Sequence, residues 1–164
     1  MKHRILVVED DPAERVGMAE LLRLWGYRTD TARDGFEALE KMLSFVPDLV
    51  VSDLNMPLMN GLELLQRLKH QRRVVSSIII TGRATPSEKR QGIALGAFAL
   101  LEKPVDSEEL KAEVTNCLQS QQIRSPVSPV AGTMEAASRR WNGWDHRTFW
   151  SKLMQRVTHH QSEE

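Results

Sequence analysis

Acidic side chains follow two apolar segments of the chain, and a lysine follows a third. Glu9, Asp10 and Asp11 come directly after the run Ile-Leu-Val-Val, Asp53 follows Leu-Val-Val-Ser, and Lys103 follows Ala-Leu-Leu-Glu. Carboxylates within several ångströms repel each other by roughly 1–4 kcal/mol per pair at effective dielectric constants of 20–80. Mg²⁺ offsets such repulsion, because it prefers one or two carboxylates together with water and phosphate oxygens. With a nearby ammonium group, these residue types suit an aspartate that carries a phosphoryl group.

The three consecutive acids need not share one role. Asp11 is followed by Pro12 and, three residues on, by Glu14, which is the pattern of a helix N-cap. Glu9 and Asp10 are then left to face Asp53. A solvated acidic loop is the simpler alternative, but it explains Glu9 alone and not the position of the other acids at strand ends.

Strand-like and helix-like segments alternate over the first 120 residues or so. The expected strands are Arg4–Val8, Tyr27–Ala32, Asp48–Ser52, Ser77–Thr81 and Ala97–Leu101. Runs such as Leu-Val-Val-Ser and Ser-Ile-Ile-Ile-Thr lack polar alternation, as in strands buried on both faces. Four intervening segments begin with a capping residue three positions before a Glu: Asp11, Asp34, Thr85 and Asp106. This order predicts an α/β fold, a parallel sheet with helices on both faces. The side chains at the carboxyl ends of its strands meet in one crevice.

Composition excludes several classes of protein. The chain of 164 residues has 22 basic and 22 acidic side chains, so no overall charge favours nucleic acid or an anionic membrane. No apolar run approaches the ~20 residues of a membrane span. The single cysteine, Cys117, cannot form a disulfide framework, which favours a reducing cytoplasm. It belongs to an apolar stripe of the last expected helix, so we expect it to pack in the core.

Four segments, in order, resemble the motifs of the receiver domain of two-component response regulators, the CheY-like superfamily. They are VVEDDP, SDLNMPLMNGLELL, IIITGRA and GAFALLEKPV. The resemblance covers about residues 3–120, and we assign residues 3–121 to a receiver domain. It implies a flavodoxin-like fold with a five-stranded parallel sheet in the order 2-1-3-4-5.

The resemblance also implies a phosphorylation site. Asp53 would be the phosphoacceptor, taking phosphate from a phosphohistidine of a histidine kinase. Mg²⁺ would be bound by Asp10, Asp53 and the backbone carbonyl of Asn55, with Glu9 acting through water.

Further roles follow from the same resemblance. Lys103 would pair with the phosphoryl group, and Thr81 would move to donate a hydrogen bond to it. Thr81 would also suit its strand by β-propensity alone. The Lys103–Pro104 bond is expected to be cis, and Asn55 and Arg83 would tune how readily water attacks the acyl phosphate.

One position departs from the family pattern. The family usually has Tyr or Phe three residues before the lysine, where this chain has Leu100. Phe98 would point to the same side of the strand, nearer its start. The usual coupling between the threonine and an aromatic side chain is therefore in question.

The chain changes in character after the receiver segment. Residues 122–140, rich in Pro, Ser and Gly, are expected to form a flexible linker. Residues 141–164 contain an amphipathic helix pattern that begins at Asp145 and includes Trp150 and Leu153. This helix could dock on its own receiver domain, on a second copy or in the groove of a partner. DNA binding is disfavoured, because the segment is short and its basic residues are offset by acidic ones.

The leading hypothesis is a phosphoacceptor response regulator of a bacterial two-component or phosphorelay system. Its expected partners are a sensor histidine kinase or phosphotransfer protein and a downstream protein target, with a homodimer left open. It is not expected to be an enzyme, apart from catalysing its own phosphorylation and dephosphorylation. The alternatives are a phosphorylation-independent interaction module and the receiver part of a longer transcriptional regulator. A phosphate-ester hydrolase is disfavoured, because Asn55 stands where such enzymes have a second aspartate.

Overall fold

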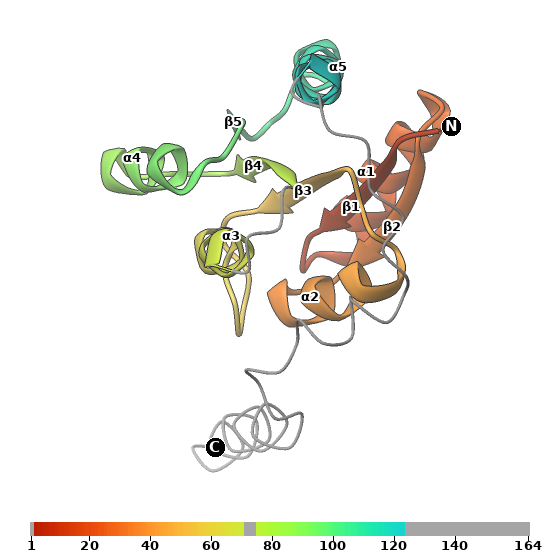
Figure 1. Cartoon of the computed structure of the whole chain (residues 1–164). Helices are drawn as coiled ribbons and strands as arrows, with labels where there is room; N and C mark the ends of the chain where they lie inside the picture. The colour runs from red at the N-terminus through yellow and green to blue at the C-terminus, as the bar shows by residue number, and fades with distance from the viewer. Residues whose placement is uncertain (1, 71–74, 124–164) are drawn as a thin grey trace. The chain divides into compact units, whose positions relative to one another are not determined.

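The computed structural model describes residues 2–70 and 75–123, in which strands and helices alternate (Figure 1). The elements are β1 (Arg4–Val8), α1 (Pro12–Leu24), β2 (Arg28–Ala32), α2 (Gly35–Ser44), β3 (Leu49–Asp53), α3 (Gly61–His70), β4 (Ser76–Thr81), α4 (Pro86–Leu95), β5 (Ala99–Glu102) and α5 (Ser107–Ile123). All strand pairs are parallel, in the order β2-β1-β3-β4-β5. The predicted fold class and strand order are therefore confirmed.

Both faces of the sheet are buried beneath helices. Side chains of α1 and α5 pack on one face, where Ile5, Val51 and Ile80 belong to one apolar cluster. Side chains of α2 and α3 pack on the other face, against Leu6 and Val50. Figure 1 shows α5 on the opposite side of the sheet from α2 and α3. Because neighbouring residues of β1, β3 and β4 enter different clusters, these central strands lack the polar alternation of a half-exposed sheet.

The strand at the edge of the sheet begins later than predicted. Ala97 was expected to open it, but β5 starts at Ala99. Helix α4 ends at Leu95 and is capped by Gly96, whose φ of 96° is the left-handed conformation that favours glycine. The Ala97 N–H then donates to the carbonyl of Gly92. The helix end therefore uses the residue that the apolar run assigned to the strand.

The predicted capping residues are confirmed, but only one of the four forms a reciprocal box. In α4 the Thr85 side chain accepts from the Glu88 N–H and the Glu88 side chain accepts from the Thr85 N–H. A second box begins α3 and was missed: the Asn60 side chain accepts from the Glu63 N–H, and the Glu63 carboxylate accepts from the Asn60 N–H. The spacing Asn60-Gly-Leu-Glu63 carries this signal in the sequence.

The last described helix extends further than expected. Cys117 is fully buried in it, as predicted, and burial raises the pKa of its thiol. Helix α5 runs to Ile123, two residues into the range assigned to the linker. The rest of that linker and the helix expected at Asp145 lie outside the described residues and stay predictions. Among the residues that the structure describes, no helix is both long enough and apolar enough to cross a bilayer.

Candidate phosphoacceptor site

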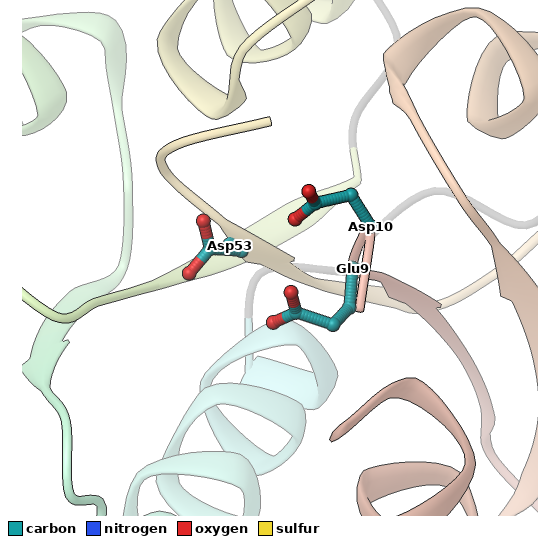
Figure 2. Close-up of side chains that lie close together, drawn as sticks. All are labelled: Glu9, Asp10 and Asp53. Atoms are coloured by element: carbon teal, nitrogen blue, oxygen red, sulfur yellow. The ribbon is translucent and has the colours of Figure 1, made fainter. Parts of the chain in front are cut away.

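The topology brings the acids of two strands together at one edge of the sheet. Strands β1 and β3 are neighbours with Val8 opposite Ser52, so Glu9 and Asp10 emerge beside Asp53. Carboxylate oxygens of these three acids lie within 4.8 Å of one another. Figure 2 shows the three side chains close together, with those of Glu9 and Asp10 extending toward Asp53. The convergence predicted from the strand ends is therefore present.

Lys103 contacts two of these three acids. Its Nζ lies 2.9 Å from Asp53 Oδ1 and 2.9 Å from Glu9 Oε2. It also lies 2.5 Å from Glu14 Oε2, a contact that sequence reasoning missed. The Lys103 N–H donates to the carbonyl of Thr81, which anchors the backbone at the end of β4, and the expected cis bond to Pro104 is present.

Burial and charge act in opposite directions on the ionisable groups of this site. Burial raises the pKa of Glu9, and the charge of Asp53 adds to that effect, while the hydrogen bond from Lys103 opposes it. For Lys103, burial acts to lower the pKa. Hydrogen bonds to Glu14, Asp53 and Glu9 outweigh burial and hold the pKa of Lys103 above its ordinary value. The lysine is therefore an ammonium ion at neutral pH.

Both oxygens of the Asp53 carboxylate have defined partners. Lys103 contacts Oδ1, and the Asn55 N–H donates to Oδ2 at 2.5 Å. The side chain is only 6% exposed. A carboxylate held at both oxygens has a fixed orientation toward the opening between the strand ends.

Arg15 fixes the loop that carries the other two acids. Its Nη1 donates to the backbone carbonyls of Glu9 at 2.7 Å and Asp10 at 3.0 Å. Sequence reasoning missed this role. An arginine one turn into the helix after an acidic strand end was the available signal.

Thr81 lies at the end of β4 and is buried. Its Oγ1 accepts from the Arg83 N–H at 3.2 Å and from the Asn55 side-chain amide at 3.4 Å. The structure thus brings the threonine against the loop that follows Asp53. Its movement toward a phosphoryl group and the Asn55 carbonyl as a metal ligand stay predictions.

The departure at Leu100 has a structural counterpart. Leu100 is half-buried and packs against the cluster of Leu54, Leu62 and Ile79. A Cβ on Gly92 of α4 would lie 3.3 Å from its methyl groups. Phe98 precedes β5 and is 40% exposed. Strand β5 therefore packs an aliphatic side chain against α4 at the position where the family usually has Tyr or Phe.

Comparison with known proteins agrees with this geometry. Residues 5–115 match the family described as the response regulator receiver domain. The chain belongs to this family. Over 130 residues it is 36% identical to the response regulator MprA of Mycobacterium avium, covering 79% of this chain and 57% of that protein. It is 39% identical to MprA of Mycobacterium ulcerans over 119 residues, covering 73% and 51%. The chain thus spans about half the length of these curated relatives.

Solved structures share the receiver fold. A CheY-like receiver domain protein from Methanospirillum hungatei superposes with a TM-score of 0.73 at 29% identity, covering 76% of this chain and 100% of that one. The receiver domain of a signal transduction histidine kinase from Syntrophus aciditrophicus gives a TM-score of 0.69 at 29% identity, covering 78% and 98%. Receiver domains similar to this chain therefore occur in proteins of different kinds.

Proposed function

We propose that Asp53 accepts a phosphoryl group from a phosphohistidine of a sensor histidine kinase or phosphotransfer protein. The ion pair between Lys103 Nζ and Asp53 Oδ1, at 2.9 Å beside the acids Glu9 and Asp10, carries this proposal. Receiver domains in general interact with such kinases and with downstream effectors, and are not classical enzymes.

The transfer exchanges one bond to phosphorus for another. An Asp53 carboxylate oxygen bonds to phosphorus as the bond to the donor's imidazole nitrogen breaks, and that nitrogen keeps the electron pair. Lys103 places a positive charge beside the new phosphoryl oxygens. Hydrolysis restores the unphosphorylated chain: water attacks phosphorus, and inorganic phosphate leaves the regenerated Asp53 carboxylate.

The acidic cluster has the chemistry of a magnesium site. Its oxygen donors are of the type Mg²⁺ prefers, and their mutual distances of at most 4.8 Å fit a shared cation. We expect Asp10 and Asp53 to bind the ion, together with the Asn55 carbonyl, and Glu9 to act through water. Bound there, Mg²⁺ would neutralise negative charge on the transferring group.

We also propose that the phosphorylated chain signals by binding a downstream protein.

Two observations favour alternatives to this proposal. The half-buried Leu100 favours the alternative of a module that signals without phosphorylation. The chain covers at most 57% of the two MprA relatives described above. This coverage favours the alternative of a receiver that is part of a longer transcriptional regulator. The single cysteine, buried as a thiol, supports a cytoplasmic location.

Uptake of phosphate from acetyl phosphate tests the proposal. Intact-mass measurement should show one added phosphoryl group on the wild-type chain with Mg²⁺ and none after chelation. Asp53→Asn, which keeps the size of the side chain, should take up none. Undiminished uptake by Asp53→Asn would contradict the assignment of the acceptor.

A further inference from the structure

Glu14 occupies a position in α1 where a glutamate ordinarily caps its own helix. It stands three residues after the N-cap Asp11, as Glu88 stands three residues after Thr85 in α4. Glu88 accepts from the Thr85 N–H at 2.7 Å. In α1 the Asp11 N–H donates to Glu9 Oε1 instead, and Glu14 Oε2 accepts from Lys103. Glu14 therefore contributes to the lysine rather than to its helix end.

The contact with Glu14 completes the hydrogen bonding of the lysine. An ammonium group has three N–H donors. Lys103 Nζ has three carboxylate partners, namely Glu9, Asp53 and Glu14. A phosphoryl oxygen can gain a donor from Lys103 only if one carboxylate gives it up.

The free-energy cost of losing the contact with Lys103 differs among the three carboxylates. The Glu9 side chain is 10% exposed, so losing its counter-charge would leave a buried carboxylate unpaired. Asp53 is the proposed acceptor itself. The Glu14 side chain is 55% exposed and can return to water. Glu14 and Lys103 also line one cavity of about 460 Å³.

The negative charge of Glu14 also acts against a phosphoryl group beside Lys103. Glu14 is not one of the three acids whose oxygens cluster within 4.8 Å, so it adds negative charge beside the site without joining the cation-binding group. Phosphoryl groups are anions and are repelled by that charge. We propose that Glu14 is a positioning residue that competes with the phosphoryl group for Lys103, and so weakens retention of phosphate. This inference rests on the proposed phosphorylation of Asp53.

Binding of beryllofluoride, a phosphoryl analogue, tests the competition directly. The full-length chain is saturated with Mg²⁺ and titrated with beryllofluoride, and binding is followed by the amide signals next to Thr81. Glu14→Gln and Glu14→Ala should both lower the Kd about two- to fivefold, the size of effect expected of an exposed charge pair. Glu20→Gln is the matched control, because Glu20 is an exposed glutamate of the same helix that pairs with Arg23. It should leave the Kd unchanged.

The Mg²⁺ affinity without beryllofluoride separates competition from a merely structural role. Loss of the Glu14 charge should leave the Mg²⁺ Kd unchanged or raise it slightly, opposite to its effect on beryllofluoride. Unchanged or weaker beryllofluoride binding in both Glu14 variants would overturn the inference while leaving the proposed function intact. An equal gain in Glu20→Gln would also overturn it. Absence of beryllofluoride binding by the wild type would instead remove the proposed function and this inference with it.

Discussion

At the scale of single residues, the site concentrates negative charge around one ammonium group. Glu9, Asp10 and Asp53 approach within 4.8 Å of one another, and Lys103 contacts two of them. Unit charges about 4 Å apart repel by roughly 1 kcal/mol even in water. Their repulsion therefore lowers the stability of the folded state unless a cation is bound. Functional sites commonly lower stability in this way.

Asp10→Asn tests this conflict between stability and metal binding. Removing one charge should raise the free energy of unfolding in the absence of Mg²⁺ by about 0.5–1 kcal/mol. The Mg²⁺ Kd should rise by at least about tenfold, since even changes outside the ligand shell cost that much. Thermal unfolding and magnesium titration measure the two effects.

Asp11→Asn is the matched control for that variant. It removes a neighbouring charge, and asparagine caps helices about as well as aspartate. A loss of Mg²⁺ affinity in Asp11→Asn equal to that in Asp10→Asn would contradict the assigned ligand.

The site residues that could be predicted from the sequence follow from local patterns, whereas Glu14 was missed because it contacts a residue far away in the chain. Asp10, Asp53 and Lys103 could be placed because their positions follow from strand ends, which depend on local patterns. The contact between Glu14 and Lys103 joins residues 89 positions apart. Locally, Glu14 has the signature of a capping box, and only the packed structure shows that its carboxylate turns to the lysine instead.

At the scale of elements, the start of α3 is pressed against the loop that carries the acceptor. The Gly61 N–H donates to the carbonyl of Leu54 at 2.9 Å. A Cβ on Gly61 would lie 2.4 Å from the carbonyl oxygen of Asp53, too close for any side chain. The glycine therefore permits the close approach of helix and acceptor strand.

Gly61→Ala should disturb this approach. The backbone must shift to accommodate the methyl group, which should cost about 1–3 kcal/mol of unfolding free energy and slow uptake of phosphate by displacing Asp53. Gly17→Ala in α1 is the control, because a Cβ there meets nothing within 4 Å. It should stabilise the helix by about 0.5–1 kcal/mol. Urea unfolding compares the two, and a Gly61→Ala chain as stable as the wild type would contradict the contact.

At the scale of the whole molecule, the described residues form a closed α/β unit. The buried apolar clusters that the structure describes extend from Ile5 to Leu118, and the family match covers residues 5–115. The placement of strands and helices was predictable, because buried parallel strands and helix caps have strong local patterns. The strand order followed from the resemblance of the motifs to the receiver family. The function of residues 124–164 was not, because a composition rich in Pro and Ser and one apolar stripe fit several roles.

A chain ending at Ile123 tests the independence of this unit. All the buried apolar clusters that the structure describes lie within that length, so we expect its melting temperature and phosphate uptake to equal those of the full chain. Differential scanning calorimetry and intact mass measure the two properties. Loss of the cooperative transition on truncation would show that the later residues complete the fold.

The most direct test of the whole account is chemical location of the phosphoryl group. After treatment with acetyl phosphate and Mg²⁺, borohydride reduces an acyl phosphate to an alcohol, so a phosphorylated aspartate becomes homoserine. Peptide mass spectrometry should find homoserine at position 53, dependent on both reagents. Homoserine at another aspartate, or an unmodified Asp53 in a chain that has gained phosphate, would contradict the account.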